Sequence, residues 1–300
     1  MSAATSEGTG RVYGVRRVCS AWELARSTWY AQAAATRPDR APPAKRGPKT
    51  ALSDEALVAA IRAVLAVSPF TGEGYRKVWA KLRAEGIRSG KSRVLRLMGA
   101  HGLLAPQRGG GPRGPRAHEG TILTEAPDLM WGTDFSTTVT LREGTAAVFI
   151  AVDHCTAELV GVHAAARATR WEALEPIRQG VRERFGRIGA KVASGLRLRH
   201  DHGTQYMADD FQQELAFLGI ASSPSFVRAP EGNGCAERMI RTLKEQLLWV
   251  RTFETVEELR QALLAWQKVY NEHWMVGRHG HRSPAQVRRD HHAAMQRMAA

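Results

Sequence analysis

Two segments that interrupt the hydrophobic periodicity of this chain constrain its fold more than any other feature. They read TRPDRAPPAKRGPKT from Thr36 to Thr50 and PQRGGGPRGPRAHEG from Pro106 to Gly120. Both are rich in Pro, Gly and Arg and poor in apolar residues, as linkers are. The 300-residue length suits two or three domains. We therefore expect a helical N-terminal segment over 1–35, a basic linker over 36–50, a domain over 51–105, a Gly/Pro/Arg linker over 106–120, a large domain over 121–290 and a tail over 291–300.

The positive charge of the chain is concentrated in its first 120 residues. These hold 21 Lys and Arg against 8 Asp and Glu, whereas the remaining 180 hold 22 against 21. A positive field favours the phosphate backbone through counterion release, so nucleic acid is the first partner to consider. Charge alone leaves open a basic tail that aids solubility or touches ribosomal RNA.

Neither a membrane nor a secreted location is indicated. The chain has no apolar run of 18 residues, and its first residues lack a basic segment followed by an apolar one. The three cysteines, Cys19, Cys155 and Cys235, lie far apart and without metal-ligand spacing. We expect a cytoplasmic protein with no disulfide and no zinc site.

Residues 11–35 have apolar positions at helical spacing, and Ser27 is placed to cap a second short helix. We interpret this part as a fragment of a helix-turn-helix unit.

The middle part predicts three short helices. Ser53 caps the first, Pro69 ends it, and Gly86 stops the second. The third carries inward apolar residues and outward polar ones, namely Val94, Leu95, Leu97 and Met98 against Lys91, Ser92, Arg93 and Arg96. This pattern fits a helix-turn-helix domain whose last helix enters the major groove, with Lys91, Arg93 and Arg96 as DNA-binding residues. A small three-helix bundle with a solvated charged face is the alternative.

The third part alternates between strand and helix patterns. Strands are predicted over 129–135, 145–152, 159–164, 196–200 and 220–222, and helices over 170–185, 209–218, 233–250 and 256–272. Three strands followed by alternating helices and strands predict an α/β domain with a mixed five-stranded sheet covered by helices.

Three acidic residues stand at the predicted ends of these elements. Asp134 closes the first strand, Asp201 closes the fourth, and Glu237 begins a helix 35 residues farther on. Functional groups of α/β sheets collect at strand ends and adjoining helix termini. Clustered carboxylates repel one another unless a cation offsets their charge, which indicates a metal site.

The residues around these acids resemble those of the DDE transposases and retroviral integrases. The resemblance lies in the acid interval, the Trp131-Gly132-Thr133-Asp134 motif, the run from Arg199 to Tyr206 and the run from Asn233 to Arg238. Further motifs resemble insertion-sequence transposases of the second-reading-frame type: Gly74-Tyr75-Arg76, Arg93 to Met98, Tyr270-Asn271 and Arg282-Ser283-Pro284-Ala285. Together they extend from about Val12 to Val287.

This resemblance implies a ribonuclease-H-like catalytic core and phosphoryl transfer on DNA with two Mg²⁺ or Mn²⁺ ions. It makes Asp134 a ligand of both ions and Asp201 and Glu237 ligands of one each. Water is the first nucleophile and frees a 3′-OH, which then joins another strand. Arg241 and Lys244, on the helical face of Glu237, are expected to hold phosphates.

The partners implied by the resemblance are double-stranded DNA, both terminal inverted repeats and target, and further copies of the chain assembled on that DNA. The family also implies a partner encoded in an upstream frame and a nucleoid-associated location in a bacterial cytoplasm.

His200, His202 and Asn233 are expected to support the acids. In a strand, His200 and His202 point away from the face of Asp201, which favours orienting or contacting DNA over binding a metal. Asp153 also ends a strand, and we interpret it as a structural partner because it lacks the preceding tryptophan.

Two other functions remain open. The chain is alternatively a non-catalytic DNA-binding protein derived from a transposase, or a ribonuclease-H-like nuclease that cuts RNA in hybrids. The helix-turn-helix domain favours duplex DNA over the latter, since the major groove is readable in B-form DNA.

Overall fold

The computed structural model describes residues 3–35, 52–106, 122–225 and 233–299. The predicted linkers over 36–50 and 106–120, apart from Pro106, lie outside the described residues. The chain divides into two compact units, one within residues 1–51 and one within residues 52–300. Within the described ranges no helix combines the length and apolar character that a membrane crossing requires.

Over residues 3–35, the first unit forms the helices α1 (Gly14–Ala21) and α2 (Arg26–Ala35). Cys19 is its buried side chain in α1. The prediction that Ser27 caps α2 is wrong, because the carbonyl of Ala25 already accepts the first hydrogen bonds, from Thr28 and Trp29. Ser27 therefore lies within the helix.

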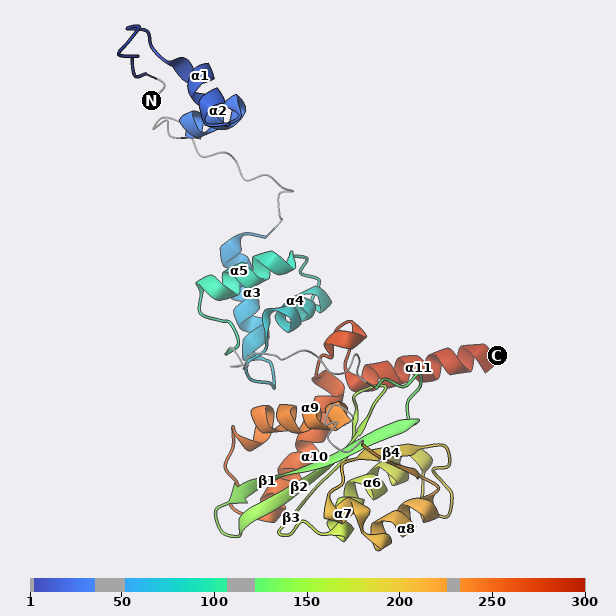
Figure 1. The fold of residues 1–300 in the computed structure, drawn as a ribbon. Helices are drawn as coiled ribbons and strands as arrows, with labels where there is room; N and C mark the ends of the chain where they lie inside the picture. The colour runs from blue at the N-terminus through green and yellow to red at the C-terminus, as the bar shows by residue number, and fades with distance from the viewer. Residues whose placement is uncertain (1–2, 36–51, 107–121, 226–232, 300) are drawn as a thin grey trace. The chain divides into compact units, whose positions relative to one another are not determined.

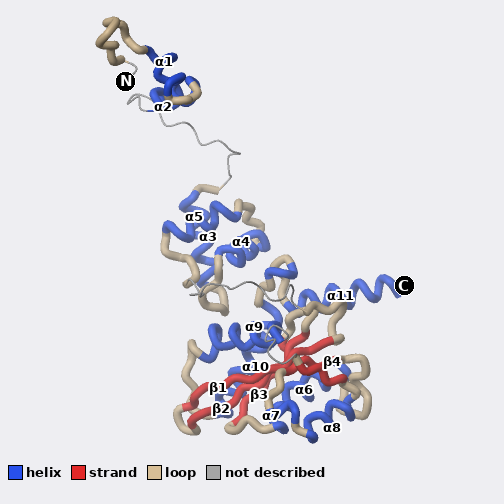
Figure 2. Tube along the Cα trace, viewed as in Figure 1, coloured by secondary structure: helices blue, strands red, loops and turns tan. Residues whose placement is uncertain are grey.

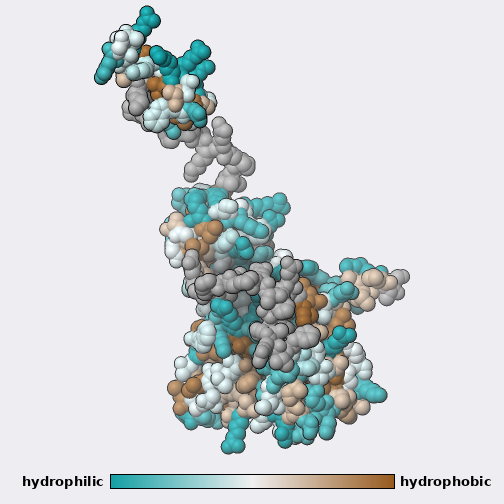
Figure 3. Space-filling model, viewed as in Figure 1, coloured by the Kyte–Doolittle hydropathy of each residue, from teal (hydrophilic) through white to brown (hydrophobic). Residues whose placement is uncertain are grey.

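The second unit begins with the three predicted helices, α3 (Asp54–Ala66), α4 (Tyr75–Ala84) and α5 (Lys91–Ala100). Ser53 caps α3 as expected, with its hydroxyl accepting from the backbone N–H of Ala56 at 3.1 Å. One apolar core joins the helices through Leu57, Ile61, Val78, Leu82, Val94 and Met98. Figure 3 shows hydrophilic side chains spread over the outside of these helices.

One predicted core residue of α5 is exposed. Leu95 has 39% of its surface in contact with solvent, whereas Val94, Leu97 and Met98 are buried. The three buried residues follow the i, i+3, i+4 spacing of a single helix face, and Leu95 falls about 100° away from Val94.

The predicted mixed sheet is confirmed. Its strands are β1 (Met130–Thr140), β2 (Gly144–Asp153), β3 (Leu159–Ala165), β4 (Arg197–His200) and β5 (Ala221–Pro224), in the order β3-β2-β1-β4-β5. The first three pair antiparallel, and β4 and β5 continue the sheet parallel to β1. Figure 2 shows the strands as one layer among helices.

Both faces of the sheet are covered. Ile150 and Val152 of β2 pack on the side of α9 (Gly234–Leu243) and α10 (Val256–His273), while Phe149 and Ala151 pack on the side of α6 (Arg170–Phe185) and α8 (Asp209–Leu218). Successive side chains of a strand point to opposite faces, so β2 is apolar throughout because both of its faces are buried. Figure 1 shows these helices on the two sides of the sheet.

The structure differs from the sequence prediction in three elements. β1 extends to Thr140 because it pairs with β2 along its whole length, so Asp134 lies inside a strand rather than at its end. A short helix, α7 (Thr204–Met207), follows Asp201.

The third difference is a helix that the sequence pattern did not predict, α11 (Pro284–Ala299), which includes most of residues 291–300. A buried ion pair fixes this helix, since Arg288 bonds Asp128 at 2.6 Å and also pairs with Glu158.

The packing of α6 directly on β3 yields a stability prediction. A Cβ added at Gly161 would stand 1.8 Å from the carbonyl oxygen of Pro176, which belongs to the helix backbone. We expect Gly161→Ala to lower the free energy of unfolding by at least about 3 kcal/mol, because the helix must move away from the strand. Urea denaturation followed by circular dichroism measures the change.

Gly189→Ala serves as the matched control, because a Cβ there meets only Arg187 Nε at 3.9 Å. We expect it to change the free energy of unfolding by less than about 0.5 kcal/mol. Equal stability of the Gly161→Ala protein and the wild type would contradict the close approach of α6 to β3.

Candidate active site

The parallel pairing of β1 with β4 sets the positions of the first two acids. Gly132 lies beside Arg199 in this pairing. Two residues farther along each chain, the same register brings Asp134 level with Asp201. Asp201 comes directly after the last residue of β4. Residues two apart in a strand share a face, so Asp134 lies on the face of Gly132, the side of the sheet that α9 covers.

The start of α9 brings Glu237 to the same face. Asn233, immediately before the helix, donates from its buried amide Nδ2 to the backbone oxygen of Thr133 at 2.9 Å. A Cβ added at Gly132 would stand 3.4 Å from the Cβ of Ala236. The helix therefore begins against β1, with Glu237 in its first turn as predicted.

The electrostatics of Asp134 reflect the proximity of the three acids. Burial raises the pKa of Asp134 to about 6, and the negative charges of Asp201 and Glu237 act in the same direction. The backbone N–H of Phe135, which donates to the carboxylate at 2.8 Å, and the charge of Lys244 oppose this increase. Asp134 is thus a carboxylate whose ionised form is destabilised by its surroundings.

The carboxylates of Asp134, Asp201 and Glu237 fit a hard divalent cation. Carboxylate oxygens are the preferred ligands of Mg²⁺, and a positive ion removes the repulsion between the three negative charges. Among the residues described here, no three Asp, Glu, His or Cys side chains are gathered tightly enough to enclose an ion. Repulsion keeps uncompensated carboxylates apart, and a bound cation favours their closer approach.

His200 is buried on the opposite face of the sheet, as expected for its place in the strand. Its Nε2 lies 2.9 Å from Ser222 Oγ, and its Nδ1 lies 2.6 Å from the carbonyl oxygen of Asp201. Both ring nitrogens are therefore occupied, and burial lowers the pKa of the imidazole. These contacts join His200 to the backbone of Asp201 and to β5, while His202 is exposed in the following turn.

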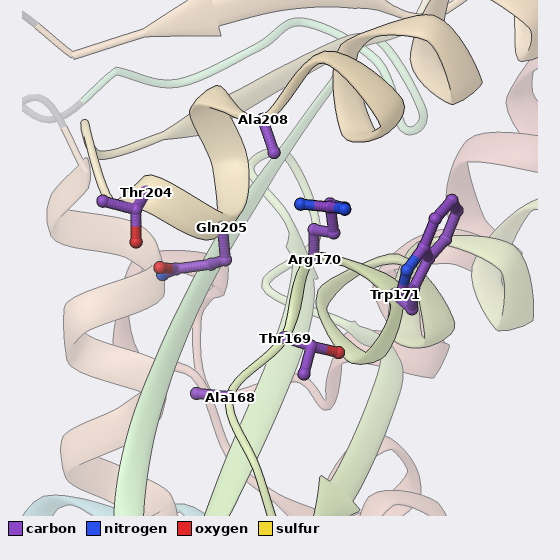
Figure 4. Close-up of a pocket in the computed structure, with 7 residues that line it drawn as sticks. All are labelled: Ala168, Thr169, Arg170, Trp171, Thr204, Gln205 and Ala208. Atoms are coloured by element: carbon purple, nitrogen blue, oxygen red, sulfur yellow. The ribbon is translucent and has the colours of Figure 1, made fainter.

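A pocket opens beside Asp201, between α7 and the first turn of α6. Its volume is about 370 Å³, and Figure 4 shows Thr204 and Gln205 on one side and Arg170 and Trp171 on the other. The Gln205 amide Nε2 is buried without a hydrogen-bond partner among the described residues. No sequence pattern predicts this pocket, because its walls come from two helices that are distant in sequence.

The basic residues predicted after Glu237 differ in their surroundings. Arg241 is 57% exposed and pairs with Glu245 at 3.0 Å. Lys244 begins a π-helical turn (Lys244–Leu248), and its charge acts on the pKa of Asp134. Of these two basic residues, it is Lys244 whose charge lowers the pKa of Asp134.

The predicted DNA-binding residues of α5 are arranged differently from the expectation. The guanidinium of Arg93, predicted to point outward, donates to Asp54 Oδ1 at 2.7 Å and to the backbone oxygen of Leu52 at 2.8 Å. Arg96 is more exposed and pairs with the same Asp54. These hydrogen bonds lower the pKa of Asp54, Arg96 having the larger effect. Lys91 is exposed, with its Nζ 4.3 Å from the centre of the Trp79 ring.

Asp153 has the structural position that the sequence indicates. Its Oδ1 accepts from the backbone N–H and hydroxyl of Thr156, and its Oδ2 accepts from the backbone N–H of Asp128. The next residue, His154, was not predicted to matter, and it lies buried against Gly132, two residues before Asp134. Only the fold reveals this contact.

Comparison with protein families matches three parts of the chain. Residues 52–110 match an HTH-like domain, and residues 124–230 and 218–284 match two models of the integrase core domain. Together the two integrase core matches span 124–284, which is more than half of the chain.

Several curated relatives are transposases. The chain is 28% identical over 293 residues to the transposase for insertion sequence element IS629 of Shigella sonnei, covering 94% of both chains. It is 27% identical over 222 residues to transposase InsD for insertion element IS2 of Escherichia coli, covering 72% of this chain and 73% of that one.

Solved structures with a related arrangement include a simian T-cell lymphotropic virus intasome in complex with the PP2A regulatory subunit B56 gamma. That likeness has a TM-score of 0.46 and 18% identity and covers 70% of both chains. The HTLV-2 integrase catalytic core domain in complex with magnesium matches with a TM-score of 0.41 and 16% identity, covering 55% of this chain and 98% of that one.

The order of the domains, the family matches and the named relatives agree with one another. This chain belongs to the insertion-sequence transposases that carry an integrase core domain behind an HTH-like domain.

Proposed function

We propose that this transposase cleaves DNA at the ends of an insertion sequence and joins those ends to target DNA, using two Mg²⁺ or Mn²⁺ ions. Asp134 would contribute to both ions, and Asp201 and Glu237 to one each. The observation that carries the proposal is the register of β1 with β4, which brings Asp134 level with Asp201 on the face of the sheet where α9 begins with Glu237 in its first turn. Burial and the charges of the two neighbouring acids raise the pKa of Asp134 to about 6. A bound cation stabilises the ionised form of a carboxylate that its surroundings destabilise in this way.

The bound ions supply positive charge and Lewis acidity to an in-line phosphoryl transfer. Water attacks the phosphodiester at the end of the element, which leaves a 3′-OH on the element and a 5′-phosphate on the flanking strand. That 3′-OH then attacks a phosphodiester of the target strand, forms a new ester bond to its phosphorus and releases the 3′-OH of the target. Neither reaction requires a protein nucleophile, so the acids serve as ligands. Lys244 adds positive charge beside Asp134, where a phosphate would lie.

The pocket beside Asp201 suits a DNA strand that approaches the acids. Its polar groups include the amide of Gln205, the hydroxyl of Thr204 and the guanidinium of Arg170, and it adjoins the N-terminus of α6. Hydrogen-bond donors at a helix N-terminus favour a phosphate group.

Double-stranded DNA is the proposed partner of both domains, and we propose that copies of the chain assemble on the paired ends of the element. From the family resemblance we also propose that the chain acts as a fusion to, or in a complex with, an upstream-frame protein.

The catalytic assignment predicts the outcome of a strand-transfer assay with the full chain, duplexes carrying the terminal repeats of its element, and Mg²⁺. We expect Asp134→Asn, Asp201→Asn and Glu237→Gln each to lower the rate by at least about a hundredfold, because each removes a charged ligand. DNA binding, measured by fluorescence anisotropy, should remain.

The control is Asp209→Asn, an exposed acid in the first turn of α8, and it should retain the wild-type rate. Activity that survives both Asp134→Asn and Glu237→Gln would refute the site assignment. A wild type that binds the repeats and never cleaves them would instead identify a non-catalytic DNA-binding protein.

The pKa of Asp134 gives a second prediction, which is independent of activity. A folded-state pKa of about 6, above the ordinary value of 3.8 for an aspartate, means that the folded protein holds this proton more strongly than the unfolded chain. The stability contributed by Asp134 is therefore present at low pH and is lost as the pH rises from about 4 through 6. We expect Asp134→Asn to melt at a higher temperature than the wild type at pH 7.5 without divalent ions.

Addition of Mg²⁺ should raise the melting temperature of the wild type and have a smaller effect on Asp134→Asn, because ion binding stabilises the charged site. At pH 4 the two proteins should melt together. A melting temperature of Asp134→Asn equal to or below that of the wild type at pH 7.5 would contradict the electrostatic strain at Asp134.

The arrangement of α5 predicts unequal roles for its basic residues in DNA binding. Lys91→Ala should weaken binding and reduce the slope of log affinity against log salt concentration by about 0.9, as expected for one lost phosphate contact. Arg93→Ala should mainly lower stability, since Arg93 bonds Asp54 and Leu52.

Anisotropy titrations at several salt concentrations measure these slopes. Arg62→Ala, an exposed basic residue on α3, is the control and should leave the slope unchanged. An unchanged slope for Lys91→Ala would exclude this residue from the DNA contact.

A further inference from the structure

His154 lies in the turn after β2, with 1% of its surface exposed. Its backbone N–H donates to Met130 of β1 at 3.0 Å, and its carbonyl oxygen accepts from Arg278 at 2.8 Å. The backbone of His154 is therefore held on both sides. His154 has no role in the phosphoryl transfer proposed above.

The protonation of the ring follows from its neighbours. Nδ1 lies 3.0 Å from the backbone oxygen of Ile122, and a carbonyl oxygen can only accept, so Nδ1 carries the hydrogen. Burial lowers the pKa of His154, which keeps the ring neutral. Its Nε2 then presents a lone pair, and this buried atom has no hydrogen-bond partner among the described residues.

A second buried acceptor lies close by. Asn233 is 4% exposed, and its Nδ2 is used by the backbone oxygen of Thr133. Its Oδ1 is buried and has no donor within the described part of the chain. An asparagine at this position usually accepts from the N–H groups of its own helix, but this side chain makes no such bond and turns to β1 instead.

Both acceptors lie close to Gly132 and to each other. The position that a Cβ of residue 132 would take lies 2.9 Å from His154 Nε2 and 3.2 Å from Asn233 Oδ1, so these two atoms are at most about 6 Å apart, a separation that one water can bridge. Burying two hydrogen-bond acceptors costs free energy unless each of them accepts from a donor. Neither of these two atoms can donate to the other. A small polar molecule with two hydrogens meets this requirement.

We propose that one buried water donates hydrogen bonds to His154 Nε2 and Asn233 Oδ1, and that His154 is thereby a positioning residue for the acidic site. Asn233 is bound to Thr133, which precedes Asp134, and it begins the helix that carries Glu237. The bridge therefore fixes the separation of two of the three acids. This inference rests on the proposed function.

The first test compares His154→Leu with His154→Gln in the full chain. Loss of a group that supports metal ligands typically costs 10- to 100-fold, so we expect His154→Leu to lower the cleavage rate about tenfold and to raise the Mg²⁺ concentration for half-maximal rate by a similar factor. Affinity for the terminal repeats should not change. His154→Gln keeps a polar acceptor and should recover to within about threefold of the wild type.

The control is His163→Gln, a buried histidine of β3 that pairs with Glu172 instead of facing the acids. It should retain the wild-type rate and Mg²⁺ dependence. Equal defects in His154→Leu and His154→Gln, or an unchanged Mg²⁺ dependence in a folded His154→Leu, would overturn the proposal.

A second test needs no activity. In ¹⁵N spectra of histidine-labelled protein at pH 7, His154 should be the neutral tautomer with hydrogen on Nδ1, and Nε2 should show the shift of a hydrogen-bonded acceptor. Hydrogen on Nε2 would mean a direct bond to Asn233 and would overturn the water bridge. Because this readout does not depend on cleavage, it separates failure of this proposal from failure of the proposed function.

Discussion

The parallel pairing of β4 with β1 is the constraint on which the rest of the site depends. Its offset places Asp201 level with Asp134, and no local feature near either acid could do so. β1 also pairs with β2 along its length, so the strand that carries Asp134 is held on both sides. The centre of the sheet thus positions Asp134 and Asp201. Functional groups that need a fixed geometry are best placed on such rigid elements.

The position of Glu237, the third acid, depends on side-chain contacts between the start of α9 and the same strand, β1. Asn233 binds the backbone before Asp134, and Gly132 leaves room for the start of α9. Burial raises the pKa of Asp134, and the negative charges of Asp201 and Glu237 act in the same direction, a cost to stability that cation binding would offset. Stability and function are therefore opposed at this residue, which is common at active sites.

The sequence predicted the elements well wherever periodicity was strong. The strands and helices of the core appear close to their predicted bounds, and β2 reads as an unbroken apolar run because both of its faces are buried. Local pattern could not predict long-range contacts. Arg93 reads as an outward basic residue, yet Asp54, 39 residues earlier, binds it. Likewise the end of β1 was misplaced, because pairing with β2 continues beyond the motif that ends at Asp134.

The central claim is that Asp134, Asp201 and Glu237 share bound divalent ions. Crystals of the full chain grown with Mn²⁺ would test it most directly, since anomalous scattering locates the metal. The account predicts anomalous peaks within about 2.5 Å of carboxylate oxygens of Asp134 and of at least one of the other two acids. Mn²⁺ bound elsewhere in the core, with none at Asp134, would contradict it.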